Sequence, residues 1–177
     1  MRFGYLGNLN NIIDIEGMCS VVQRVCALGV PVRCSVIGKG EREQTVVSRL
    51  EQAGAQVSFY GPIYDENRKL EILGETDFCF NMFKSSVVVG LTTKSTDYFS
   101  FGLPIINTIR GDTWDMVRTS GVGINDTGDN EEEILRAIET GEIVRMKRAA
   151  FALYRQLFTR QVLSDIVRDS FHAIGIL

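Results

Sequence analysis

The chain has 177 residues, of which 45% are hydrophobic and 23% are charged, and its formal net charge at pH 7 is −3. This composition is typical of one soluble globular domain, and the small negative charge excludes a strongly basic surface for nucleic acid. No apolar run approaches the roughly 20 residues that a membrane-spanning helix requires. Met1 and Arg2 lead directly into strand-like sequence without a signal peptide. We therefore expect residues 1–177 to be a single domain of a longer, two-domain chain.

In the first part of the chain, apolar runs alternate with helical patterns. Strands are predicted at 2–9, 32–37 and 56–60, followed by helices at 15–28, 41–53 and 65–73. Asp14 is the expected cap of the first helix, and the glycines of 38–40 predict a tight turn after the second strand.

The same alternation continues to the end. Further strands are predicted at 78–83, 103–106 and 122–125, with helices between them and a helical region at 143–177 that is broken near Thr159. Strands that alternate with helices form βαβ units with right-handed crossovers. The fold class is therefore α/β, a Rossmann-like doubly wound parallel sheet of about six strands with helices on both faces.

The stretch 81–107 organises the chain, because it reads as strand, polar loop, short helix and strand. In an open parallel sheet, ligands bind at the carboxyl ends of the strands. A helix that starts at Thr92 or Thr93 and carries Lys94 offers free N–H groups, hydroxyls and a cation to a phosphate. Asp97, in the first turn, can accept hydrogen bonds from a sugar diol. The alternative is an ordinary capped helix with a solvated charge.

The four cysteines are Cys19, Cys26, Cys34 and Cys79. None belongs to a C-x-x-C pair, and each lies among apolar neighbours in a predicted helix or strand. This pattern favours buried free thiols in a reducing cytoplasm over disulfides or zinc ligands.

Other motifs are weaker. Gly38-Lys39-Gly40 lacks the third glycine of a dinucleotide-binding fingerprint, but as a turn near a phosphate it makes Lys39 and Arg42 available. The P-loop pattern is absent, which excludes a P-loop kinase or ATPase. The sole histidine, His172, is expected at the surface or the end of the last helix, and Trp114 either flanks a ligand or belongs to the core.

Six pieces of sequence occur in an order that resembles a known family. Lys94-Ser95-Thr96-Asp97-Tyr98 and Gly102-Leu103-Pro104-Ile105-Ile106 are similar to the block K-x-x-E-Y … G-x-P-V-I of GT-B glycosyltransferases of group 1, or family 4. The other pieces are Tyr5-Leu6-Gly7, Val36-Ile37-Gly38-Lys39-Gly40, Val57-Ser58-Phe59-Tyr60-Gly61 and Leu73-Gly74-Glu75-Thr76-Asp77-Phe78. The resemblance covers nearly the whole chain and is to the C-terminal, nucleotide-sugar-binding domain of these enzymes.

The resemblance implies a site for the donor of a sugar transfer. Asp97 would bind the ribose, Tyr60 and Pro62 would meet the base, and Gly7 with the 92–94 helix start would lie near the diphosphate and the donor sugar. The donor would be a UDP- or GDP-sugar, with neither a cofactor nor a bound metal. The expected donor-binding residues are Gly7, Asn8, Lys39, Arg42, Tyr60, Pro62, Lys84, Ser85, Thr92, Thr93, Lys94 and Asp97.

The chain departs from the family pattern at the cations and at one acid. The second acid of the E-x7-E motif falls on Val89, and Asp97 replaces the usual glutamate. The family's arginine and lysine near the first helix fall on Asn8 and on Glu16. Four cations are expected to substitute for that missing pair, namely Lys39, Arg42, Lys84 and Lys94.

The acceptor site and the catalytic base would belong to an N-terminal domain that precedes Met1. No catalytic residue is therefore expected in this fragment, which alone should transfer nothing. The full-length enzyme would pass a sugar to a glycan or lipid-linked acceptor in polysaccharide biosynthesis, in the cytoplasm or peripherally at the membrane face. Two alternatives are open: a non-catalytic GT-B-like scaffold or partner-binding domain, and half of a nucleotide-sugar epimerase.

Overall fold

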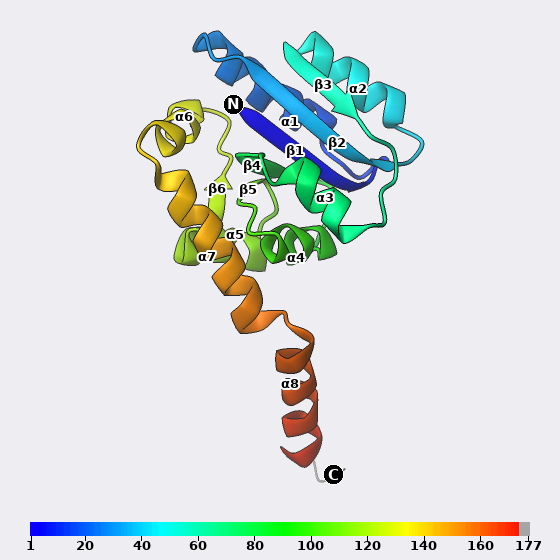
Figure 1. The fold of residues 1–177 in the computed structure, drawn as a ribbon, viewed down its shortest axis with the longest axis vertical. Helices are drawn as coiled ribbons and strands as arrows, with labels where there is room; N and C mark the ends of the chain where they lie inside the picture. Colours follow the sequence, from blue (N-terminus) through cyan, green and yellow to red (C-terminus); the bar gives the residue numbers. More distant parts are fainter. Residues whose placement is uncertain (174–177) are drawn as a thin grey trace.

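The computed structural model describes residues 1–173, which form one six-stranded parallel sheet covered by helices (Figure 1). The strand order is β3-β2-β1-β4-β5-β6. The strands are β1 (Arg2–Asn8), β2 (Val32–Lys39), β3 (Ala55–Phe59), β4 (Phe78–Asn81), β5 (Ile105–Asn107) and β6 (Gly123–Asn125). The helices are α1 (Ile15–Ala27), α2 (Glu43–Gln52), α3 (Glu66–Leu73), α4 (Thr93–Ser100), α5 (Asp112–Ser120), α6 (Glu131–Glu139), α7 (Glu142–Leu157) and α8 (Arg160–Ala173). The predicted fold class, a doubly wound Rossmann-like sheet, is confirmed.

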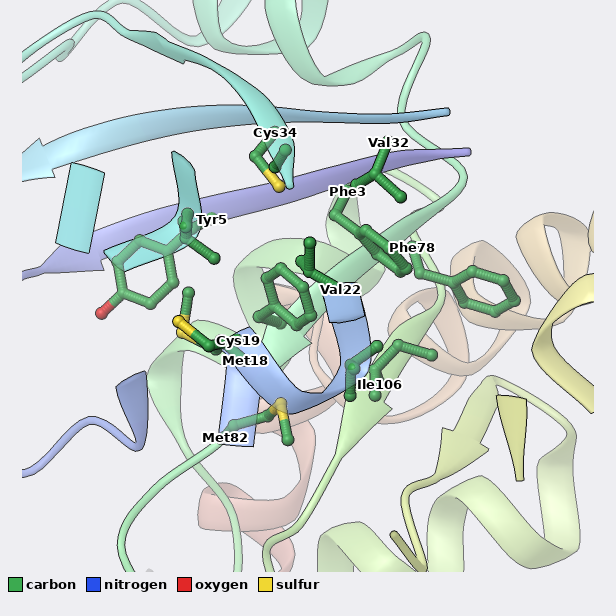
Figure 2. Packing of buried hydrophobic residues seen from close by; sticks show 14 of the residues in the cluster. Phe3, Tyr5, Met18, Cys19, Val22, Val32, Cys34, Phe78, Met82 and Ile106 are labelled. Carbon is green, nitrogen blue, oxygen red and sulfur yellow. The ribbon is translucent and has the colours of Figure 1, made fainter. Parts of the chain in front are cut away.

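Two hydrophobic cores cover the two faces of the sheet. One core joins the strands to α1, α2 and α6, and Figure 2 shows Met18 and Val22 of α1 among strand side chains that include Phe3 and Tyr5. The other core joins them to α3, α4 and α5. Helix α7 contributes to both, because Met146 belongs to the first core and its later residues belong to the second.

Local signals set the ends of several elements where the sequence predicts them. The Asp14 carboxylate accepts a hydrogen bond from the Gly17 N–H at 2.9 Å and caps α1. The Thr92 hydroxyl accepts from the Ser95 N–H at 3.0 Å and caps α4, which ends before Gly102 at φ +65°.

Several predicted strand boundaries are wrong: β4 ends at Asn81 rather than at 83, β5 begins at Ile105 rather than at 103, and β2 ends later than predicted. Strand β2 does not turn at Gly38 but continues to Lys39, because Gly7 and Asn8 of β1 pair with Gly38 and Lys39. The two backbones approach so closely that a Cβ atom at Gly38 would lie 2.0 Å from the carbonyl oxygen of Gly7. The glycines in this region serve close strand pairing, and the turn itself comes after Lys39.

Strands β1 and β4 separate where the strand order reverses. They are paired only at Phe3 with Phe78 and at Gly4 with Cys79. Beyond that point, the buried hydroxyl of Tyr98 accepts a hydrogen bond from the Leu6 N–H at 2.9 Å. The same hydroxyl donates to the Phe80 carbonyl oxygen at 3.2 Å. Tyr98 of α4 thus replaces the missing backbone pairing between the two halves of the sheet.

The C-terminal helices differ in how they pack. Helix α7 packs against α4, α5 and α6, whereas α8 extends away from the sheet (Figure 1) and exposes Leu163, Ile166, Val167 and Phe171. The last four residues of the predicted helical region, 174–177, lie outside the described residues. None of the described helices is long and apolar enough to cross a membrane. All four cysteines are free thiols, and only Cys26 is not fully buried.

We expect Tyr98→Phe to destabilise the fold by about 1–3 kcal/mol, because it leaves a buried N–H and a buried carbonyl without their partner. The measurement is the free energy of unfolding in urea. Tyr154→Phe is the matched control, since the Tyr154 hydroxyl makes no hydrogen bond within residues 1–173. Equal stabilities of the two variants would contradict the bridging role of Tyr98.

Candidate functional site

A cavity of about 300 Å³ lies at the carboxyl ends of β1 and β2. We call it the first cavity. Its lining is Leu6, Gly7, Asn8, Ile37, Gly38, Lys39, Pro62, Ile63, Tyr64, Lys69 and Asp97. Five predicted donor-binding residues are therefore brought together here, from β1, β2, the loop after β3 and helix α4. The place is the crevice next to the reversal of strand order, where open α/β sheets bind ligands.

Charged and polar groups converge on the first cavity. Loss of solvent raises the pKa of the Asp97 carboxyl above its usual value, while Lys69 opposes the rise and Glu66 adds to it. The Lys69 ammonium is paired with Glu66 at 2.5 Å. The Lys39 ammonium donates a hydrogen bond to the Tyr64 hydroxyl at 3.3 Å. The cavity therefore offers a carboxylate and two ammonium groups to a polar ligand.

Sequence reasoning missed Tyr64 and Lys69. The sequence could have indicated them only through their positions on either side of Asp65. Asp65 caps α3 by accepting a hydrogen bond from the Arg68 N–H at 2.7 Å. A helix that begins just after the predicted base-binding loop directs its first turns toward the same crevice.

A second cavity of about 440 Å³ follows strands β4 and β5. Its lining is Asp14, Phe83, Lys84, Ser85, Val87, Val88, Val89, Thr108, Ile109, Arg110 and Asp126. It contains the predicted residues Lys84 and Ser85, and also Val89, at which the family pattern would place an acid. The Arg110 guanidinium lies 3.6 Å from the centre of the Trp114 ring in a cation–π contact. Trp114 therefore packs against a residue that lines the second cavity but does not line the cavity itself.

Lys94 lies between the two cavities. Its Nζ atom is 3.7 Å from the centre of the Tyr5 ring and 5.4 Å from that of Phe83, which lines the second cavity. A Cβ atom at Gly7, which lines the first cavity, would lie 3.2 Å from Cε of Lys94. Helix α4 covers one face of the sheet and Tyr5 belongs to the core on the other. The lysine side chain therefore crosses the sheet edge where β1 and β4 diverge.

The Lys94 ammonium is buried without a hydrogen-bond acceptor in the described part of the chain. Burial lowers its pKa to about 7, and Cys79 opposes the change. A buried cation is normally paired, because removal of water destabilises the charged form. The arrangement can therefore accept an anion at the start of α4, where the N–H groups of the first turn have no partner within the helix.

A row of three linked asparagine amides, of which Asn81 and Asn107 are buried and Asn125 is half-buried, holds the start of α4 in place. Asn81, Asn107 and Asn125 are the paired last residues of β4, β5 and β6. Asn81 donates to Oδ1 of Asn107 at 2.9 Å, and Asn107 donates to Oδ1 of Asn125 at 2.8 Å. The Thr92 hydroxyl donates to Oδ1 of Asn81 at 3.1 Å. The helix cap beside Lys94 is thereby tied to three strands.

Three further predicted residues line neither the first nor the second cavity. Thr93 is the exposed first residue of α4. Tyr60 lines a separate cavity of about 480 Å³, with Arg33 and Gln56, between α3 and the strands β2 and β3. Arg42 lies at the start of α2, where its N–H donates to the Leu9 carbonyl at 3.0 Å, and it lines neither the first nor the second cavity. Their roles toward a ligand stay predictions, as do those of the other candidate residues. Within residues 1–173, no group of three or more His, Cys, Asp or Glu side chains is placed to hold a metal ion.

Comparison with known proteins gives structural likeness only. No protein-family model matches the chain, and no curated protein does. The catalytic domain of cholesterol-α-glucosyltransferase from Helicobacter pylori has a TM-score of 0.66 at 17% identity, over 88% of this chain and 98% of that one. Anabaena Alr3699/HepE in complex with UDP has a TM-score of 0.66 at 16% identity, over 96% of this chain and 48% of that one.

A third similar structure is an isolated C-terminal domain of a glycosyl transferase group 1 family protein (LpcC) from Francisella tularensis. Its TM-score is 0.61 at 14% identity, over 90% of this chain and 86% of that one. The chain has the fold of a GT-B glycosyltransferase C-terminal domain. It thus spans nearly all of two single-domain structures but about half of HepE.

We expect Lys94→Met to stabilise the chain at pH 7 by an amount on the order of a few kcal/mol, because it removes a buried cation that has no partner. The folded pKa of about 7 lies below the ordinary value of 10.5. The unfolded chain therefore binds more protons between these values, and the free energy of unfolding of the wild type rises with pH across that window.

Urea unfolding at pH 7, 8 and 9 measures this difference. The advantage of Lys94→Met should shrink as the pH rises. Lys147→Met, a lysine of α7 outside both cavities, should show no such trend. A Lys94→Met variant no more stable than wild type at pH 7 would contradict the account of an unpaired ammonium.

Asn107→Leu should lower the free energy of unfolding by about 3 kcal/mol. The Nδ2 group of Asn81, the Oδ1 atom of Asn125 and the Ile109 N–H would each lose the hydrogen bond that Asn107 now makes to them. Asn67→Leu on the exposed side of α3 should change it by no more than about 0.5 kcal/mol. Thermal unfolding of the two variants provides the comparison, and a mild effect at Asn107 would show that the amide row is dispensable.

Proposed function

We propose that this chain is the donor-binding domain of a GT-B glycosyltransferase of group 1, and that it binds a nucleotide sugar across the two cavities. The observation that carries the proposal is Lys94, an unpaired buried ammonium between two cavities at the carboxyl edge of the sheet. A diphosphate joins a nucleoside to a sugar, so its charge falls in the middle of the ligand. A cation between two cavities matches that distribution of charge.

The nucleoside fits the first cavity. Its ribose hydroxyls would donate to the Asp97 carboxylate, and its base would lie against Pro62 and Tyr64. A cavity of about 300 Å³ is at the lower end of the range for small-molecule sites, which suits one nucleoside rather than the whole donor. The base would be uracil or guanine, and the complex of HepE with UDP supports the former.

The diphosphate would lie along Gly7 and the start of α4. Gly7 has φ +134°, and the end of the Lys94 side chain occupies the space that a side chain at Gly7 would enter, which puts the cation beside the proposed phosphate position. Lys94 and the free N–H groups of the first turn would stabilise the negative charge of the departing diphosphate. This chemistry needs no bound metal, and we propose that the transfer is metal-independent.

The donor sugar would enter the second cavity, beside Lys84, Ser85 and Arg110. The acceptor, a glycan or a lipid-linked sugar, and the catalytic base would come from an N-terminal domain, so that this fragment alone is inactive. The full enzyme would be a hexosyltransferase of polysaccharide biosynthesis that works at the cytoplasmic side of the membrane.

A specific observation favours a second candidate, a non-catalytic scaffold. Val89 lines the second cavity at the position of the family's acid, and Val88 beside it is fully exposed. An apolar loop of this kind also suits contact with another protein. A scaffold need not bind nucleotides, whereas a donor-binding domain must.

We expect Asp97→Asn to weaken the binding of UDP or GDP by tenfold or more, because hydrogen bonds to a charged acceptor contribute about 1.5–3 kcal/mol. Calorimetric titration of both nucleotides and their sugar conjugates measures it. Asp115→Asn on α5, which changes an exposed carboxylate outside both cavities, is the matched control. Absence of binding by the wild type at millimolar concentration would reject the donor site in favour of the scaffold.

A further inference from the structure

Within the described part of the chain, no carboxylate pairs with the Lys94 ammonium to hold it protonated. Two other buried polar atoms lack a hydrogen bond in the described part of the chain, Nε of Arg24 and Oε2 of Glu131, but they are an ion pair 3.1 Å apart. Lys94 makes no ion pair within residues 1–173. Its ammonium nitrogen lies 3.7 Å from the centre of the Tyr5 ring and 5.4 Å from that of Phe83 instead.

The titratable groups on the surrounding strands are neutral. On β1, the Tyr5 hydroxyl donates to the Asn8 carbonyl at 2.7 Å, and burial raises its pKa. On β4, burial also raises the pKa of the Cys79 thiol. Neither group supplies a negative charge near pH 7.

The charged groups on the neighbouring helices face elsewhere. On α4 itself, Asp97 lines the first cavity, and on α3 the Lys69 ammonium is paired with Glu66. On α7, the Lys147 ammonium donates to the Gly74 carbonyl at 3.4 Å. Residues 1–173 therefore hold no carboxylate paired with Lys94, and a bound anion is what can supply the missing negative charge.

We propose that above pH 7 Lys94 is largely uncharged in the empty site and takes up a proton when the donor's diphosphate binds, so that nucleotide-sugar binding is coupled to protonation. This inference rests on the proposed function and adds its pH dependence. An anion beside the amine favours the charged form and raises the pKa of Lys94 again. In the bound state, the Lys94 ammonium would lie over the Tyr5 ring in a cation–π contact, and the diphosphate would neutralise its charge.

The coupling has a definite size. With a free-state pKa of about 7, binding should take up about 0.9 proton at pH 8 and about 0.1 at pH 6, provided the bound lysine stays charged. The affinity should fall about fiftyfold between pH 7 and pH 9 for the same reason. Uridine, which lacks phosphate, should bind without proton uptake.

The test is calorimetric titration of the 177-residue chain with UDP-glucose and GDP-mannose at pH 6, 7, 8 and 9. Nucleotide sugars are the right probes, because their diphosphate diester keeps a constant charge over this range, unlike free UDP. Each titration is repeated in buffers of different ionisation enthalpy, which yields the number of protons taken up. Lys94→Met should bind at least tenfold more weakly with no pH dependence, and Lys147→Met should behave as wild type.

The outcomes separate the two proposals. Binding with no proton uptake at pH 8 overturns the coupling and leaves the donor site intact. No binding of either nucleotide sugar at any pH overturns both. A further experiment needs neither a variant nor a ligand. NMR titration of the lysine ε-CH₂ signals of the free chain should show one lysine whose titration midpoint lies near pH 7. A free chain in which every lysine titrates above pH 9 also overturns the coupling.

Discussion

The structure depends on the gap between β1 and β4. At the point where the strand order reverses, the pairing of β1 with β4 stops after Gly4 and Cys79. The gap leaves backbone groups that a buried sheet must satisfy, and the Tyr98 hydroxyl satisfies two of them. Lys94 lies one turn earlier on the same helix, so its side chain enters the same gap from its open end. The residue that closes the sheet and the residue proposed to meet the diphosphate are thus fixed by one helix.

The asparagine row explains why that helix can be held so firmly. Strands β4, β5 and β6 are short, and each ends in an asparagine at the same register. Backbone pairing ends at these residues and does not hold the loops that follow. The side-chain hydrogen bonds between the three asparagines continue the connection between the strands at this point. Because Thr92 joins this row of side chains, α4 begins at a defined place relative to three strands. A phosphate site built on helix N–H groups needs that precision.

Much of the fold follows from the sequence, because its signals are local. The caps Asp14 and Thr92 and the stop at Gly102 act within a few residues, and strand and helix alternation determines the sheet. The predicted end of β2 is wrong because Gly38 looks like a turn residue in the sequence. In the structure Gly38 allows close pairing with β1, a role that depends on the neighbouring strand. The site was only partly predictable for the same reason. Tyr64, Lys69 and the asparagine row gain their meaning from register and packing, which no single stretch displays.

Lys94 shows where local and global requirements conflict. A lysine at the start of a helix is unfavourable toward the dipole, and its burial is unfavourable again through lost hydration. Both unfavourable terms fall on Lys94, whereas the other buried residues around it are apolar or have their polar groups paired. Such a conflict is expected at a functional site, because a methionine of similar length would pack there without either cost. Under the proposed function, a single desolvated amine over Tyr5 would take the place of the arginine and lysine that the family pattern puts near α1, because a charge shielded from water interacts more strongly with an anion than a solvated one does.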